Sequence, residues 1–90
     1  MKHPLNVKGY TGDHKKLAEE IANMRYDQVV IFLDALADDL NRQAKGDIKR
    51  SRVNLATELL KASFSIKEAK LCIDKAWKIS EPFMKSKDGI

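Results

Sequence analysis

Apolar residues recur at helical spacing between positions 26 and 44, and this pattern constrains the fold more than any other feature of the sequence. Plotted at about 100° per residue, the stripe covers about 120° of arc, while Asp34, Asp38 and Arg42 lie outside it. The spacing continues through the apolar run VVIFL at 29–33, so a strand is excluded there. We therefore predict an amphipathic helix whose apolar face packs against other elements. The stripe comprises Tyr26, Val29, Val30, Leu33, Leu36, Ala37, Leu40 and Ala44.

Two members of the apolar run do not fit this stripe. Ile31 points almost opposite to it, near Ala35, and Phe32 flanks it. Three interpretations are open: other helices of the same chain surround this one, a second chain packs on Ile31, Phe32 and Ala35, or the isoleucine is simply exposed, as many apolar residues are. Small cores often gain stability by dimerisation, so we expect these three residues to lie at a homodimer interface.

Glycine, proline and capping residues predict where the helices begin and end. The leader at 1–12 contains Pro4 and two glycines and is expected to be irregular. Asp13 is placed to cap a first helix, and Gly46 is a natural residue to follow the end of the second. Asp47 is then expected to cap a third helix.

A fourth helix is predicted after a break near residue 64. In the segment Ser65-Ile66-Lys67-Glu68, the serine and the glutamate can form a capping box, and Pro82 is expected to end the helix that follows. No segment alternates like a strand, so the predicted fold class is all-α, a small helical bundle with a short first helix and three longer ones, and we expect it to be dimeric. The expected organisation is an irregular leader at 1–12, one domain at 13–84 and a flexible tail at 85–90, with helices at 13–24, 26–44, 48–62 and 65–80.

The chain has 90 residues, which is enough for one domain with a small core. Its single cysteine, Cys72, allows no internal disulfide and fits a reducing compartment. The N-terminus lacks the apolar segment of a signal peptide, and no apolar run approaches the ~20 residues of a membrane span. We therefore expect a cytoplasmic protein that does not associate with membranes.

The third predicted helix carries apolar residues over a wider arc than one facing helix requires, which again indicates a contact with another chain. Arg52 falls within this arc, where it must either pair with a carboxylate or extend to solvent. The second helix offers Asp34 and Asp38, so we expect a charge pair between Arg52 and one of them. The expected interface is Ile31, Phe32, Ala35, Val53, Leu60 and Phe64, and the expected core is Leu33, Leu36, Leu40, Leu55, Leu59, Ile73 and Trp77.

Residue types that carry catalysis are scarce. The only histidines are His3 in the leader and His14 in the first turn of a helix, and Cys72 is expected on a buried stripe, where thiols are usually inert. No nucleophile elbow and no phosphate-binding glycine loop is present. Asp34 and Asp38 share a helix face, but helical metal sites also use Glu-x-x-His partners that this sequence lacks. The sequence therefore predicts a protein that is not an enzyme and that binds no cofactor and no metal.

Positive charge provides the main alternative function. The net charge is +4, and the whole excess lies in residues 46–90. Two predicted helices with a short turn in this half have the order of a helix-turn-helix motif. The second of them offers only lysines, which suit phosphates better than base edges, and carries acidic residues among them. In this alternative, a small basic nucleic-acid-binding protein, the contacts would be Lys49, Arg50, Lys61, Lys67, Lys70 and Lys78.

The leading hypothesis is a non-catalytic interaction or regulatory module. Apolar faces of its second and third helices would bury each other in a homodimer, and a different protein is the other candidate partner. Nucleic acid is the less favoured partner, because lysines interspersed with carboxylates do not form a recognition surface for bases.

Overall fold

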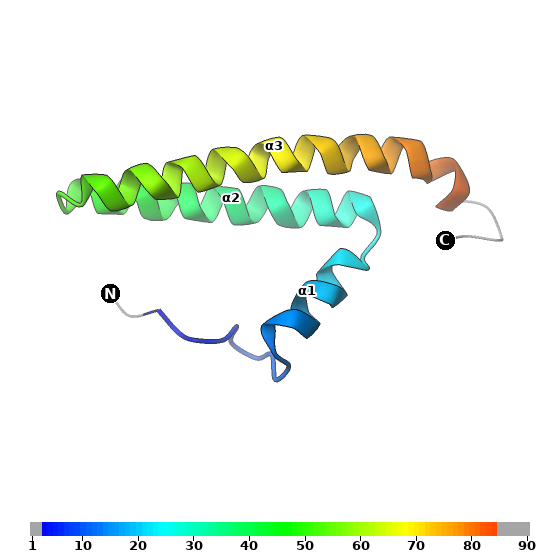
Figure 1. The fold of residues 1–90 in the computed structure, drawn as a ribbon, viewed down its shortest axis with the longest axis horizontal. Helices are drawn as coiled ribbons and strands as arrows, with labels where there is room; N and C mark the ends of the chain where they lie inside the picture. Colours follow the sequence, from blue (N-terminus) through cyan, green and yellow to red (C-terminus); the bar gives the residue numbers. More distant parts are fainter. Residues whose placement is uncertain (1–2, 85–90) are drawn as a thin grey trace.

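The computed structural model describes residues 3–84, and in this range the chain forms three helices and no strand. The predicted class, all-α, is confirmed, but the prediction of four helices was wrong. The two long helices α2 and α3 lie side by side as an antiparallel hairpin, and the short α1 leaves the start of α2 on the side away from α3 (Figure 1). The expected flexible tail at 85–90 lies outside the described residues. The helices are α1 at His14–Ala22, α2 at Tyr26–Lys49 and α3 at Val53–Met84.

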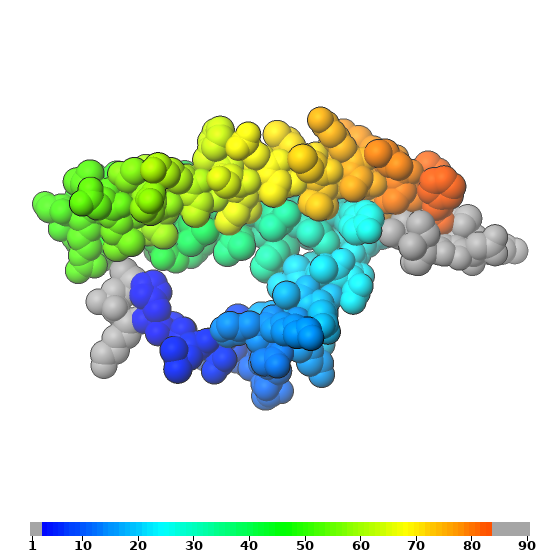
Figure 2. All heavy atoms as spheres, viewed as in Figure 1, coloured from blue at the N-terminus to red at the C-terminus, as the bar shows by residue number. Residues whose placement is uncertain are grey.

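The first helix begins where the capping pattern predicts. The backbone N–H of Lys16 donates to the Asp13 carboxylate at 2.8 Å, which satisfies one of the free donors in the first turn. α1 has a slight contact with α2 and none with α3. Together with the described part of the leader, α1 stands away from α2 and leaves an opening beside it (Figure 2). These segments therefore cover little of the hairpin.

The second helix extends beyond its predicted end, through Lys49. Gly46 lies inside it, and Asp47 is buried in its last turn, so neither marks the boundary that the sequence indicated. A glycine inside a helix costs only about 1 kcal/mol, which packing against α3 can outweigh. The chain reverses just afterwards: Ser51 has a φ of 61°, and the N–H of Arg52 donates to the carbonyl oxygen of Asp47 at 2.8 Å.

The third helix is continuous through the predicted break near residue 64. The prediction of two helices there was wrong, and the helix-turn-helix order was wrong with it. Between Val53 and Glu81 the sequence has no glycine or proline, and most residues are good helix formers, so the Ser-x-x-Glu pattern lies within a helix instead of starting one. Pro82 lies in the last turn, where a proline removes only one hydrogen bond near the helix end, and α3 runs on to Met84.

Small residues line the contact between the two long helices. Ala37 and Ala44 of α2 and Ala56 and Ser63 of α3 are buried there, and we call these four residues the seam. On each helix the two residues are seven positions apart, the repeat of paired helices. The Ser63 hydroxyl donates to the carbonyl oxygen of Ala37 at 2.8 Å, which fixes the register of the hairpin. Small side chains allow the two backbones to approach closely.

The hairpin buries no large side chain completely within the described residues. Leu36 and Leu55 were predicted in the core, but both are exposed, because they lie beside the seam and no further helix covers them. The rest of the expected core is only half-buried. The buried hydrophobic residues are Val29, Ala37, Ala44 and Ala56, and the half-buried members of the expected core are Leu33, Leu40, Leu59, Ile73 and Trp77.

Candidate interaction surface

The seam divides the surface of the hairpin into two flanks. The helical repeat places each residue beside the seam on one of its two sides. In an antiparallel pair of helices, the residues on one side of α2 lie next to the residues on the same side of α3. Ion pairs between the helices identify one side, and uncharged residues occupy the other side in the part of the hairpin away from the turn. The charged flank consists of Asp27, Asp34, Asp38, Lys67, Lys70 and Asp74, and the apolar flank consists of Val29, Phe32, Leu36, Ala62, Ser65, Ala69, Cys72 and Ala76.

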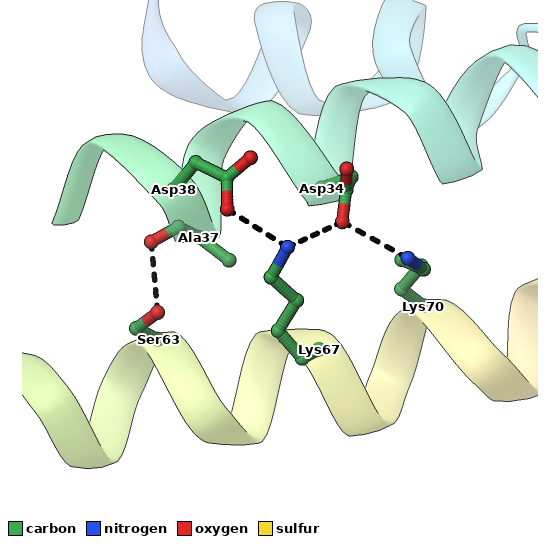
Figure 3. A network of polar contacts seen from close by, with 6 residues as sticks. All are labelled: Asp34, Ala37, Asp38, Ser63, Lys67 and Lys70. Carbon is green, nitrogen blue, oxygen red and sulfur yellow. Dashed lines mark hydrogen bonds and ion pairs between the residues drawn. The ribbon is translucent and has the colours of Figure 1, made fainter. Parts of the chain in front are cut away.

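On the charged flank, the Lys67 ammonium lies between two carboxylates of the facing helix (Figure 3). It donates to Asp34 and lies 2.8 Å from a carboxylate oxygen of Asp38, while the Lys70 ammonium donates to Asp34 at 2.9 Å. The two hydrogen bonds to Asp34 join residues 33 and 36 positions apart in the sequence, so they act across the hairpin. They also satisfy much of the charge of this flank within one chain.

The ion pairs shift the titration of their members. Hydrogen bonds from Lys67 and Lys70 hold the pKa of Asp34 below its ordinary value, against the opposing effect of desolvation. Hydrogen bonds to Asp34 and Asp38 raise the pKa of Lys67. These groups are partly exposed, so solvent screens them and each pair contributes little to stability. Their main effect is to favour one register of the hairpin.

The apolar flank has bulky side chains on one helix and small ones on the other. On α2, Phe32 is 37% exposed and Leu36 is 39% exposed. The facing positions of α3 carry alanines at intervals of seven, Ala62, Ala69 and Ala76, of which Ala69 is exposed. A ridge of bulky side chains on α2 therefore runs beside a shallow row of alanines on α3. None of the eight residues named for the apolar flank carries a charge, but seven positions closer to the turn the same helical rows carry Asp39 on α2 and Glu58 on α3.

A second apolar region lies on α3, on the same side of the seam as the charged flank. We call it the outer stripe, and it consists of Val53, Leu60, Phe64 and Leu71. Its members are exposed, Phe64 to 66%. Lys67 interrupts the stripe, and the acidic residues of α2 lie across from it. The outer stripe therefore combines apolar and charged groups within its own length.

The six residues expected at the interface are all exposed, but they do not share one surface. Phe32 lies on the apolar flank. Ile31 lies on the charged side of α2, where the ion pairs with α3 separate it from the outer stripe. Ala35 points away from α3. These six residues cannot all contact a single partner helix. The remaining three, Val53, Leu60 and Phe64, belong to the outer stripe.

Arg52 does not form the expected pair within the chain. Its guanidinium lies 3.6 Å from the carboxylate of Asp47, while Asp34 and Asp38 bind Lys67. Asp47 is 4% exposed, so the arginine neutralises a buried charge near the turn. Beside this pair is a hollow of about 280 Å³, lined by His3, Gln43, Asp47, Arg52, Leu55 and Leu59.

Most of the basic residues assigned to nucleic acid have an acidic neighbour in the described structure. Lys49 and Arg50 are exposed at the turn, where α2 ends. The others form ion pairs, which reduces the positive potential available to a phosphate backbone. The pairs are Lys61 with Glu58 at 3.3 Å, Lys67 with Asp34 and Asp38, Lys70 with Asp34, and Lys78 with Asp74 at 3.2 Å.

Within residues 3–84, no three His, Cys, Asp or Glu side chains gather closely enough to hold a metal ion. Cys72 is exposed on the apolar flank, so its predicted place on a buried stripe was wrong. None of the helices in the described range combines the length and hydrophobicity needed to cross a membrane.

Sequence reasoning missed several members of the apolar flank. Leu36 was assigned to the core, and Ala62 and Ala69 were counted among the apolar residues of their predicted helices but were not placed at the interface. The signal was present in the sequence, because alanines recur at intervals of seven on α3 and again at Ala37 and Ala44 of α2. Residues this small at a regular spacing indicate close helix contacts on more than one side of α3.

A comparison of the sequence with protein-family models found no match, and comparisons with curated proteins and with solved structures found none. The function of the chain is therefore inferred from the surface geometry of the hairpin alone.

Proposed function

We propose that this protein is a non-catalytic helical interaction module that forms a homodimer through apolar faces of α2 and α3. The observation that carries the proposal is the imbalance between buried and exposed apolar residues. Among the described residues, the buried hydrophobic ones are three alanines and one valine, whereas Phe32, Leu36 and other large apolar side chains on both helices stay exposed. A helix pair of this size is marginally stable until a second layer covers its apolar face.

A module of this kind acts by presenting surfaces instead of performing chemistry. Dimerisation through one face of the hairpin leaves the opposite face available to a different protein. The charged flank can then define the orientation of such a partner, because charge complementarity contributes more to specificity and association rate than to affinity.

The proposal is tested by the solution mass, measured by light scattering after size exclusion over a dilution series. We expect a mass near twice 10.2 kDa that persists on dilution into the low micromolar range. Circular dichroism at the same concentrations reports whether the chain is folded. A helical chain that is monomeric at every concentration would contradict the proposal.

A further inference from the structure

We infer that the apolar flank is the surface at which two copies of this chain meet, with α2 of each copy lying on α3 of the other in a four-helix bundle. This inference rests on the proposed homodimer and specifies its interface. It excludes the outer stripe, which has more exposed apolar side chains but is interrupted by Lys67 and has no row of small residues facing it.

The two helices of the apolar flank have complementary shapes. Phe32 and Leu36 project from α2, while Ala62, Ala69 and Ala76 leave a shallow row along α3. Two copies facing each other with α2 over α2 would bring the bulky side chains together and leave the alanines apart. Two copies with α2 over α3 place each ridge in the row of the partner, the knobs-into-holes arrangement of packed helices.

The register of the hairpin also suits this arrangement. The bond between Ser63 and Ala37 places these residues at one level, so residue 32 is level with residues 68 and 69 of the same chain. A two-fold axis parallel to the helices keeps every residue at its level. Phe32 of each copy then faces Ala69 of the other, and Leu36 faces the segment between Ala62 and Ser65.

Self-complementary shape favours a second copy as the occupant of this flank. Both halves of the complementary shape, the ridge on α2 and the row on α3, are present on this chain, so a second copy supplies the partner for each of them. A second copy on the outer stripe would meet no such row of small residues.

The first test compares charged substitutions on the two apolar surfaces by sedimentation equilibrium. Phe32→Asp is expected to raise the dimer dissociation constant by roughly 100-fold or more, because a symmetric interface carries the change twice. Phe64→Asp, the matched change on the outer stripe, is expected to alter it by less than about 3-fold, since surface changes outside an interface have small effects. Circular dichroism checks that both variants remain helical.

A second pair of variants avoids the loss of a large side chain. Ala69→Glu adds bulk and charge to the row on α3 without removing a hairpin contact, since Ala69 is exposed. We expect it to dissociate the dimer as strongly as Phe32→Asp does. Ala35→Glu makes the same change at an exposed alanine on the far side of α2 and is expected to leave the dimer intact.

A mixing experiment tests the arrangement of the helices. In a Cys72→Ser background, Phe32→Cys and Ala69→Cys chains are mixed and oxidised. We expect disulfide-linked dimers that contain one chain of each kind, because residue 32 faces residue 69 of the partner. Efficient crosslinking of Phe32→Cys chains with themselves would instead place α2 on α2 and overturn the arrangement.

The outcomes distinguish this inference from the proposal on which it rests. A wild-type chain that is monomeric throughout contradicts the homodimer itself. A wild-type dimer that survives Phe32→Asp and Ala69→Glu but is lost in Phe64→Asp keeps the homodimer and overturns the interface assigned here.

Discussion

The two flanks of the hairpin are formed by the same pair of helices, yet one is completed within the chain and the other is not. On the charged flank, Asp34 finds Lys67 and Lys70 across the seam. On the apolar flank, Phe32 and Leu36 run beside the alanine row of α3 and remain exposed. Ionic groups can be satisfied by one partner or by water, whereas apolar groups are stabilised only when their surface leaves water. Two helices provide enough neighbours for the first kind of surface and too few for the second.

The change with the largest expected effect acts on both flanks at once. Ala37 is completely buried in the seam, so Ala37→Leu forces the helices apart and is expected to lower the free energy of unfolding by about 2–3 kcal/mol. Urea unfolding at one fixed chain concentration measures this, because dimerisation couples stability to concentration. Ala35→Leu, at an exposed site on the same helix, is the control. Equal stability of the two variants would rule out a close contact at the seam.

Acid is expected to weaken the charged flank and not the apolar flank. The pKa of Asp34 is lowered by its lysine partners from the ordinary value of 3.8, so its contribution is present above that pH and is lost as the pH falls through the lowered pKa. The pKa of Lys67 is raised from 10.5, so its contribution is present below that pH and is lost only as the pH rises through the raised pKa.

The melting temperature should therefore be level between roughly pH 5 and pH 9 and fall below about pH 4. Asp34→Asn is expected to lower the plateau and to make the acid decline shallower. Asp27 and Asp39 also have lowered pKa values, so part of the decline will remain. A wild-type protein whose melting temperature stays constant down to pH 2 would contradict the importance of these pairs.

Salt provides a milder way to separate the two flanks. Raising the ionic strength from about 0.1 M to 1 M shortens the screening length from about 10 Å to about 3 Å and weakens partly exposed ion pairs. We expect the melting temperature to fall slightly while the dimer dissociation constant changes by less than about 3-fold. A large loss of dimer affinity in salt would mean that the charged flank takes part in the interface.

The smallest expected signal is binding to nucleic acid. Because four of the six candidate basic residues are in ion pairs, we expect no retention on immobilised single-stranded DNA at about 0.15 M salt. Salt-dependent retention that disappears in a Lys49→Ala, Arg50→Ala double variant would favour the nucleic-acid alternative. It would also assign the site to the turn of the hairpin.

The sequence predicted the helical class and the start of the first helix, because both depend on local patterns. The period of the stripe from Tyr26 to Ala44 and the Asp13 cap are signals that act within a few residues. The wrong boundaries at Gly46 and Ser65 have a common cause. Each residue has a weak local tendency to end or begin a helix, and the long contact between α2 and α3 is stronger than either tendency.

The candidate surface was predicted only in part. Exposed positions such as Phe32 could be identified from the angle at which they leave the stripe. The separation of the two flanks could not be predicted from the sequence, because it depends on how α3 is paired with α2. Once Ser63 is paired with Ala37, Leu36 is beside the seam instead of in the core, and Lys67 in place of Arg52 faces Asp34 and Asp38.

Ala37, Ala44 and Ser63 are buried where the two helices meet, and no large side chain of the described residues is completely buried there. With the pairing proposed above, a newly made chain therefore completes its interior only after it meets another chain. At low abundance most copies would remain marginally folded and open to proteolysis, and at high abundance they would protect one another. The seam would thereby make the amount of persistent protein rise steeply with the rate of synthesis, so that the protein accumulates only above a threshold rate.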